Sequence, residues 1–293
     1  MSRAGHCRVW PVQDYDLAST LSCGQAFRWV PDRDGWVGVV RGRWVRLSAG
    51  NGWVQARTAV PQRDWRWLTD YLQLEVNLAE ISASWPQDPP LRAAWAACRG
   101  LRLLRQDPWE CLASFLLSAC KAIPQIQALI ARLCACYGEA VPVPPGQSAA
   151  WSFPSPERLA TLPESSLRRL GMGFRAPHLL AAARAVADGQ LDLARLPRLP
   201  LAKARERLMQ LPGVGPKIAD CVLLFGCGFQ RAFPVDVWVA RALRESYFGG
   251  RRVPAGRLRE FADAHFGPHA GYAQQYLFHH VRTMPAAQRR LSA

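Results

Sequence analysis

The chain has 293 residues, 49% hydrophobic and 20% charged, which is the composition of a folded protein with one large or two modest domains. It carries 37 Lys and Arg against 22 Asp and Glu, a net charge of +15, so we expect a polyanionic partner, with nucleic acid the first choice. The nine cysteines form no metal-binding cluster and no apolar run could act as a signal core or cross a membrane, which predicts reduced thiols, no metal and a cytoplasmic or nucleoid location, or a nuclear one in a eukaryote.

Residues up to about 60 are predicted to form strands. "QAFRWVPDRDGWVGVVRGRWVRLSAGNGWVQARTAV" alternates apolar and polar residues, and Asp34-Gly35 and Asn51-Gly52 are typical hairpin dipeptides. We therefore expect an antiparallel meander. From Pro61 the period changes, and Trp65, Leu68 and Leu72 are spaced as one face of a helix.

Most of the chain after Pro89 is predicted to be helical. Asp107 has the features of an N-cap followed by Pro108, and the apolar residues after it predict a buried central helix. "IPQIQALIARLCACYG" is the next helix, and the Pro-rich stretch 141–156 is a loop. Further helices are expected near 156–170, 174–188, 200–210, 216–226, 236–247, 254–265 and 269–283. The predicted class is α+β, with an N-terminal antiparallel sheet domain over 1–90 and a helical domain over 91–293.

The stretch "LPGVGPKIADC", from Leu211 to Cys221, predicts a helix–hairpin–helix. Gly213, Val214 and Gly215 form a tight corner, and Pro216 suits the first turn of the following helix. Free N–H groups at such a corner can bind a DNA phosphate without reading the sequence. The alternative is an ordinary corner between two helices.

Lys217 lies in the first turn of that helix, where the helix dipole disfavours a cation and so favours the neutral, nucleophilic amine. Cys221 is one turn further along the same face. Asp236, in "FPVDVWVARAL", follows Lys217 by 19 residues, a spacing that can bring its carboxylate beside the amine. The alternatives are a phosphate-contacting lysine and a simple N-cap.

Four further motifs, together with the Lys217 and Asp236 segments, resemble one family. These are "LSCGQAFRW", "LRLLRQDPWECLASF", "LGMGFRAPHL" and "GPHAGYAQQYLF", in the order and at the spacing found in the 8-oxoguanine DNA glycosylases of the helix–hairpin–helix (HhH-GPD) superfamily. The resemblance extends over roughly residues 16–283. It implies two helical lobes with the active-site cleft between them.

The resemblance implies a bifunctional DNA glycosylase and AP lyase that acts as a monomer on duplex DNA containing a damaged purine, without a cofactor. Lys217 would attack the sugar of a flipped nucleotide, expel the base and form a Schiff base, and β-elimination would then nick the strand. Asp236 would stabilise the positive charge that develops on the sugar. Among the remaining pocket residues, Gly24 would offer its carbonyl to the N7 hydrogen of 8-oxoguanine, Cys221 and Phe278 would sandwich the base, and Gln274 would face its Watson–Crick edge.

The chain departs from the family where the opposite base is read. Cys120, Lys121 and Ala122 stand in place of asparagines, and Gln125 stands in place of the first of two arginines. Of the two arginines only the second remains, as Arg175. Among the other DNA-contacting positions, Phe174 replaces a wedge tyrosine and Trp238 stands where the family has a phosphate-contacting histidine. We therefore expect recognition of 8-oxoguanine with relaxed opposite-base specificity.

Two alternatives stay open. An enzyme of the same fold could act on another oxidised or alkylated purine. A non-catalytic lesion-binding protein is the second alternative, and the presence of both Lys217 and Asp236 argues against it.

Overall fold

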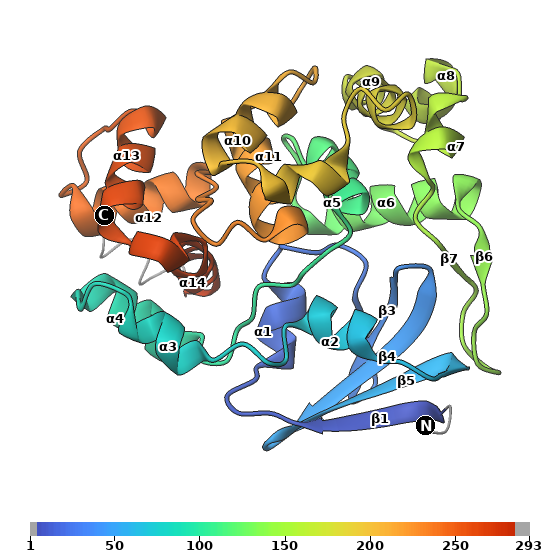
Figure 1. Ribbon diagram of the computed structural model, residues 1–293, viewed down its shortest axis with the longest axis horizontal. Coiled ribbons are helices and arrows are strands. Elements are labelled where there is room, and N and C mark those ends of the chain that lie inside the picture. Colours follow the sequence, from blue (N-terminus) through green and yellow to red (C-terminus); the bar gives the residue numbers. More distant parts are fainter. Residues whose placement is uncertain (1–4, 285–293) are drawn as a thin grey trace.

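The structure is a computed structural model that describes residues 5–284 (Figure 1). Its N-terminal part is a five-stranded antiparallel sheet in the order β1-β5-β4-β3-β2. The strands are β1 (Gly5–Pro11), β2 (Val30–Asp32), β3 (Gly35–Val40), β4 (Arg43–Gly50) and β5 (Trp53–Gln62). The rest of the described chain is mostly helical, which confirms the predicted α+β class.

The hairpin turns are set by residues that accept a positive φ. The predicted Asn51-Gly52 turn joins β4 to β5, and Gly52 has a φ of +79°. The turn predicted at Asp34-Gly35 is displaced by one residue, because Arg33 and Asp34 form the turn and Gly35 already belongs to β3. Gly35 is needed for close strand approach instead, since a Cβ there would lie 2.4 Å from the Leu47 carbonyl oxygen.

Two helices cover the sheet, and one of them was not predicted. Helix α1 (Leu17–Ser22) begins at Asp16, whose side chain accepts a hydrogen bond from the Ser19 N–H. Its six residues are too few to show a helical period beside the strands. Helix α2 (Arg66–Leu72) agrees with the predicted periodicity and ends at Gln73, which has a left-handed conformation. Helix α1 leads directly into the turn that contains Gly24.

The helical body begins with α3 (Leu78–Ala83) and α4 (Pro89–Ala97), followed by α5 (Pro108–Leu117) and α6 (Ile123–Tyr137). Asp107 caps α5 as predicted, since its Oδ1 accepts hydrogen bonds from the N–H groups of Trp109 and Glu110. Most side chains of α5 are buried, so this helix is the centre of the body. The domain boundary placed at residue 90 lies in the first turn of α4 and stays a prediction.

The following segment differs from the prediction in two places. The stretch 141–156 contains strand β7 (Ala150–Trp151), which pairs with β6 (Ala140–Val141) although only a loop was expected. The helix predicted over 156–170 is two helices, α7 (Pro156–Ala160) and α8 (Glu164–Arg169), because Pro163 starts a new helix. Both differences lie on the side of the body that faces away from α12–α14 (Figure 1).

The remaining helices are α9 (Arg175–Ala187), α10 (Leu201–Met209), α11 (Pro216–Cys221), α12 (Val237–Tyr247), α13 (Ala255–His265) and α14 (Ala270–Thr283). Two short 3-10 helices are η1 (Leu193–Arg198) and η3 (Gly267–His269), and a π-helix, η2 (Val222–Cys227), continues α11. The helix predicted over 216–226 is therefore present but changes its winding at Val222.

The described chain has two hydrophobic cores. The smaller one joins the sheet to α1 and α2, with Leu47, Leu68 and Leu72 almost fully buried. The larger one fills the helical body and includes residues of α3 and α4. Helix α4 lies against α14 (Figure 1), so the chain preceding α5 contributes to both cores. None of the helices within residues 5–284 is both long enough and apolar enough to cross a membrane.

Candidate active site

A cleft of about 1150 Å³ brings distant parts of the chain together. It is lined by the turn after α1, the turn between α5 and α6, the first turn of α11, the start of α12 and the end of α14. Four of the residues expected to catalyse the reaction or bind the base share its wall: Gly24, Lys217, Asp236 and Phe278. They are up to 254 residues apart (278 − 24), so only the fold can place them in one cleft.

The corner between α10 and α11 presents Lys217. Gly213 has a φ of +81°, and a Cβ at this position would lie 2.5 Å from the ring of His178, so only glycine fits. Gly215 is the N-cap of α11, and space around its Cα is open. Lys217 is the second residue of α11, and its Nζ lies 5.0 Å from the ring centre of Phe115 on the central helix.

Asp236 is both a helix cap and a cleft residue. Its Oδ1 accepts hydrogen bonds from the N–H groups of Trp238 and Val239, at 3.0 and 2.8 Å. Within residues 5–284 no donor bonds to Oδ2. One carboxylate oxygen therefore starts α12, and the other is available in the cleft that also contains Lys217.

Cys221 is only 3% exposed and is not among the residues that line the cleft. Burial raises the pKa of its thiol to about 12, although the nearby charge of Lys217 acts in the opposite direction. The thiol is therefore neutral at physiological pH. Cys221 is an uncharged, weakly polar sulfur one turn after Lys217 on α11.

The turn that contains Gly24 allows no side chain. Gly24 has a φ of +85°, and a Cβ would lie 2.8 Å from Ile123 and 3.1 Å from the guanidinium of Arg282. The backbone of Gly24 is consequently accessible at the cleft wall.

Helix α14 contributes both predicted residues and one that the sequence did not reveal. Phe278 lines the cleft, and Gln274 is buried one turn earlier, with no donor to its Oε1 among residues 5–284. Arg282 also lines the cleft, and its guanidinium carbon lies 5.3 Å from the ring centre of Phe278. A single arginine near the end of a helix carries no sequence signal for this position.

The residues expected to contact the opposite strand are not equally available. Cys120 is exposed with a φ of +55°, and it lines the cleft together with Lys121 and Trp238. Gln125 uses its side-chain oxygen to accept a hydrogen bond from the Ala122 N–H, and so caps its own helix.

Arg175 is buried rather than extended toward the cleft. Its Nε donates to the Ala119 carbonyl at 2.8 Å, its Nη2 bonds the same oxygen, and its Nη1 donates to the Met172 carbonyl at 3.3 Å. Phe174 is 53% exposed beside it, a large apolar side chain left in solvent. Arg175 therefore links α9 to the turn after α5.

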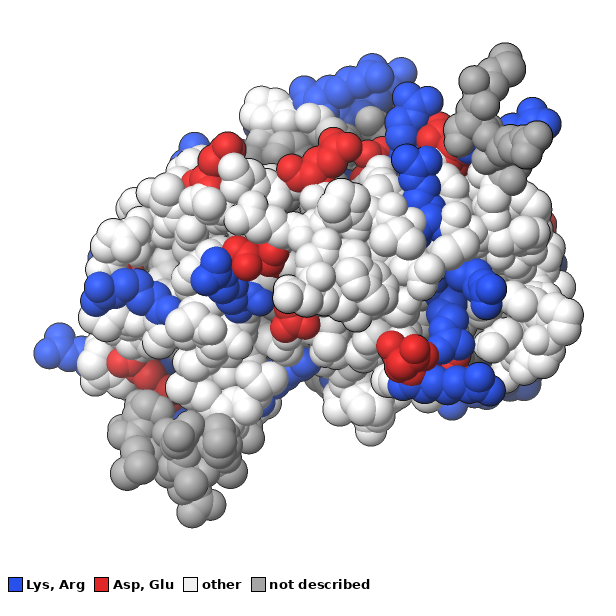
Figure 2. Space-filling view, turned by 90° about the horizontal axis from the view of Figure 1, so that it is seen from below, with Lys and Arg blue, Asp and Glu red and all other residues white. Residues whose placement is uncertain are grey.

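The cleft is positively charged. Lys121, Lys217, Arg244 and Arg282 line it, and Asp236 is the one acidic residue among the lining residues. Lys and Arg side chains also form a band across one side of the lower face of the molecule (Figure 2). A charged cleft on a strongly basic molecule suits a polyanionic backbone.

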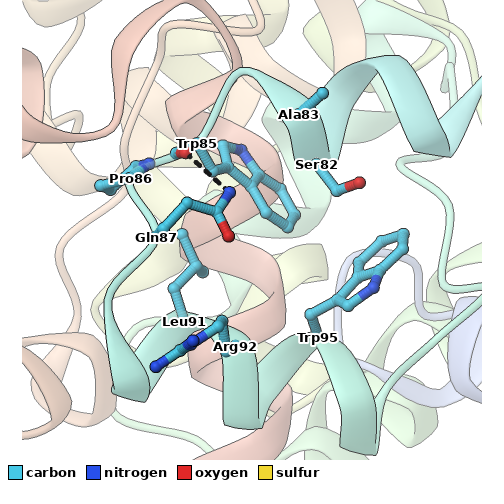
Figure 3. A pocket seen from close by; sticks show the side chains of 8 residues that line it. All are labelled: Ser82, Ala83, Trp85, Pro86, Gln87, Leu91, Arg92 and Trp95. Atoms are coloured by element: carbon cyan, nitrogen blue, oxygen red, sulfur yellow. Dashed lines mark hydrogen bonds between the residues drawn. The ribbon is translucent and has the colours of Figure 1, made fainter.

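A second hollow, of about 360 Å³, lies between α3 and α4 (Figure 3). Trp85 and Trp95 form much of its wall, with Arg92 and Gln87 also lining it. It shares no lining residue with the cleft and contains no nucleophile beside a base.

The fold and the cleft define a helix–hairpin–helix protein whose cleft is lined by a lysine and an aspartate. Residues 9–112 match the 8-oxoguanine DNA glycosylase N-terminal domain, and residues 113–262 match the HhH-GPD superfamily of base excision DNA repair proteins. The chain belongs to the HhH-GPD superfamily.

Relatives and solved structures agree with this assignment. The chain is 32% identical to a probable N-glycosylase/DNA lyase of Methanothermobacter thermautotrophicus, over 93% of this chain and 95% of that protein. It is 33% identical to the N-glycosylase/DNA lyase OGG1 of Arabidopsis thaliana, over 75% of this chain and 62% of that protein.

Two solved structures are similar over nearly the whole chain. The structure of MBOgg1 with a low affinity DNA ligand has a TM-score of 0.91 at 32% identity, covering 96% of this chain and 97% of that one. The Clostridium acetobutylicum 8-oxoguanine glycosylase/lyase, bound to duplex DNA with cytosine opposite 8-oxoguanine, has a TM-score of 0.87 at 29% identity, covering 94% and 97%.

Proposed function

We propose that this chain excises 8-oxoguanine from duplex DNA and then cleaves the strand at the abasic site, acting as a monomer. The observation that carries the proposal is the common cleft of Lys217, Asp236, Gly24 and Phe278. The match of residues 9–112 to the N-terminal domain of 8-oxoguanine DNA glycosylases supports the substrate, and the two relatives with N-glycosylase/DNA lyase names support the lyase step. Its place of action is then the chromosome, in the nucleoid or nucleus.

The reaction begins with the lesion outside the base stack, because the sugar carbon is out of reach inside the duplex; flipping costs a few kcal/mol. The Lys217 amine bonds to C1′ as the glycosidic C–N bond breaks, and the base leaves with the bonding electrons and takes up a proton. Opening of the sugar ring gives a Schiff base between Lys217 and C1′. Loss of a C2′ proton then breaks the C3′–O bond and nicks the strand.

Asp236 supplies negative charge where positive charge develops on the sugar. Its Oδ1 is held by two backbone N–H groups, so the carboxylate is fixed before the substrate arrives. A fixed charge stabilises the transition state without reorganising during the reaction. In this proposal Asp236 acts electrostatically and as the cap of α12 at once.

The lesion is read by groups on three elements. The Gly24 carbonyl accepts the N7 hydrogen that 8-oxoguanine has and guanine lacks, while Phe278 and Cys221 contact the two faces of the base. Gln274 faces the Watson–Crick edge, and its buried Oε1 has no competing donor among the described residues. A site built to bond one hydrogen rejects the base that lacks it, because its own polar group is then left unpaired.

The opposite base is read weakly in this proposal. The Gln125 side chain caps its own helix and the Arg175 guanidinium bonds the Ala119 carbonyl, so neither is free to form a bidentate contact with cytosine. Gly213, Val214 and Gly215 hold the phosphate of the lesion strand, which positions the DNA without selecting its sequence.

Borohydride trapping tests the proposal directly. The wild-type chain should form a covalent adduct with an 8-oxoguanine duplex, and Lys217→Gln should abolish it because no amine remains to form the Schiff base. DNA affinity should stay within about tenfold, since most of it comes from other phosphate contacts. A parallel reaction on a duplex containing an alkylated purine separates the two lesion classes. An adduct of normal yield in Lys217→Gln would overturn the assignment of the nucleophile.

A further inference from the structure

The backbone of residues 22–25, around Gly24, is held by side chains from distant elements. Arg282 Nη2 donates to the Ser22 carbonyl at 2.8 Å, and Gln275 Nε2 donates to the Cys23 carbonyl at 3.1 Å. From another direction, Gln106 Nε2 donates to the Gln25 carbonyl at 2.6 Å. Among these four carbonyl groups, only that of Gly24 accepts no hydrogen bond from residues 5–284.

The two donors on α14 share a face with Phe278. Positions 275, 278 and 282 follow the spacing i, i+3 and i+7, so they lie along one stripe of the helix. Gln275 is 2% exposed, and Arg282 lies over the Phe278 ring while it bonds Ser22. One stripe of α14 therefore carries both the aromatic wall of the cleft and the two donors that bond the turn around Gly24.

The other side of the turn is also fixed. Gln25 is fully buried, and its amide nitrogen donates to the carbonyls of Thr20 and Arg102, both at 2.8 Å. Its Oε1 accepts a hydrogen bond from the Leu104 N–H at 2.8 Å. Once Gln275 and Arg282 close the α14 side, the turn has little freedom to move relative to Phe278.

We propose that Gln275 and Arg282 are positioning residues for lesion recognition, which hold the Gly24 carbonyl at a fixed place against the Phe278 wall. This inference rests on the proposed function, in which that carbonyl accepts the N7 hydrogen of 8-oxoguanine. Guanine presents a lone pair at N7, which a carbonyl oxygen repels, so selectivity depends on an oxygen that cannot move away. Without the two donors the turn shifts, and the difference in affinity between 8-oxoguanine and guanine becomes smaller.

The test measures discrimination rather than activity alone. In the Lys217→Gln background, which binds without excising, affinity is measured for duplexes containing 8-oxoguanine, 8-bromoguanine or a tetrahydrofuran abasic analogue. 8-Bromoguanine has bulk at C8 but no N7 hydrogen. Gln275→Met should weaken 8-oxoguanine binding by about threefold to tenfold, the range of one hydrogen bond, and leave the other two duplexes within about twofold. Arg282→Met should act in the same direction.

Two controls separate positioning from other roles. Arg282→Lys retains a charged donor and should recover part of the discrimination. If Arg282 instead binds a phosphate, Arg282→Met should weaken the affinity for all three duplexes equally. The slope of log affinity against log salt concentration should then fall by about one. That result would overturn the positioning role of Arg282.

The lyase reaction provides the check on folding. With Lys217 present, Gln275→Met should cleave a preformed abasic duplex at the wild-type rate, because that substrate has no base to read and Gln275 does not line the cleft. Equal ratios of 8-oxoguanine to 8-bromoguanine affinity in all variants would overturn this inference while 8-oxoguanine excision by the wild-type chain still stands. Failure of the wild-type chain to excise 8-oxoguanine would overturn the proposed function itself.

Discussion

In the proposed mechanism Asp236 carries a structural and a chemical role, and a single atom of its side chain separates the two. Its Oδ1 caps α12, and this bond needs an oxygen acceptor but no charge. The electrostatic role needs the negative charge. Replacing one carboxylate oxygen by an amide nitrogen therefore removes the second role and leaves the first.

We predict that Asp236→Asn folds normally, with a change in the free energy of unfolding within about 0.5 kcal/mol, because Asn is as good an N-cap as Asp. Single-turnover excision of 8-oxoguanine should fall by a factor on the order of 100 or more. Asp107→Asn is the matched control, since Asp107 caps α5 with the same geometry and does not line the cleft. Full excision by Asp236→Asn would reduce Asp236 to a cap.

At the scale of elements, the corner between α10 and α11 contains two glycines with different requirements. Gly213 has a positive φ and lies against His178, whereas Gly215 has a φ of −91° and open space around it. The corner geometry that presents Lys217 thus depends on Gly213. Gly215 is free to serve the approach of a DNA phosphate.

We predict that Gly213→Ala destabilises the protein by at least about 1–2 kcal/mol, the cost of a left-handed conformation for alanine, with the contact to His178 added. Gly215→Ala should leave stability nearly unchanged and weaken binding to damaged and undamaged duplexes alike. Denaturant unfolding and DNA affinity measured on both variants check this pair. Equal stability of the two variants would show that the corner relaxes.

The same pair of helices contains a buried carboxylate on the side away from the cleft. Asp220 of α11 has a side chain that is 1% exposed, and its Oδ1 accepts a hydrogen bond from Arg205 Nε of α10 at 2.7 Å. Its Oδ2 has no partner among the described residues. Burial raises the pKa of Asp220 to about 6, and the charges of Arg205 and Arg259 only partly oppose it.

This raised pKa predicts an unusual dependence of stability on pH. The native state binds this proton below about pH 6 and the unfolded chain only below about pH 4, so the contribution of Asp220 to stability falls as pH rises through that interval. Relative to Asp220→Asn, the wild type should gain up to about 3 kcal/mol when pH is lowered from 7 to 4. Denaturant unfolding of both proteins at several pH values gives the difference. A gain in the opposite direction would mean that the Arg205 pair outweighs burial.

At the scale of the whole molecule, the surface expected to face the opposite strand is assembled from two segments whose joining residues are 56 positions apart. Arg175 at the start of α9 bonds the Ala119 carbonyl after α5, so the two segments are joined by the residue expected to read cytosine. The hydrogen bond that joins the two segments therefore also occupies the guanidinium group that was expected to contact cytosine. Cys120 and Lys121 remain on the cleft wall, and neither has the planar donor pair that distinguishes one base from another.

We predict that 8-oxoguanine opposite cytosine is excised faster than opposite adenine, guanine or thymine by only about tenfold or less. A bidentate arginine gives roughly 1–3 kcal/mol of discrimination, and here no such contact is free. Single-turnover excision from four duplexes that differ in the opposing base provides the measurement. A preference of several hundredfold would mean that Arg175 leaves Ala119 when DNA binds.

Local signals in the sequence were enough for much of the fold. The alternation of the strands, the Asp107 cap and the glycine corner before Lys217 act over a few residues, so the sheet and helix–hairpin–helix were predictable. The unpredicted α1 and the β6–β7 pair are too short for a periodic pattern, and their stability comes from packing against distant segments. The turn at Arg33-Asp34 moved by one residue because the partner strand requires Gly35.

The sequence by itself determined which residue types this protein has for chemistry: an amine in a first helical turn, a carboxylate at a cap and a strongly basic surface. Only the tertiary structure decided that Lys217, Asp236, Gly24 and Phe278 line one cleft, and that Arg282 joins them. The physical reason is the distance along the chain over which each interaction acts. Capping and turn formation depend on neighbours in the chain, whereas the bond between Gln275 and Cys23 joins residues 252 positions apart and exists only once the helical body has packed.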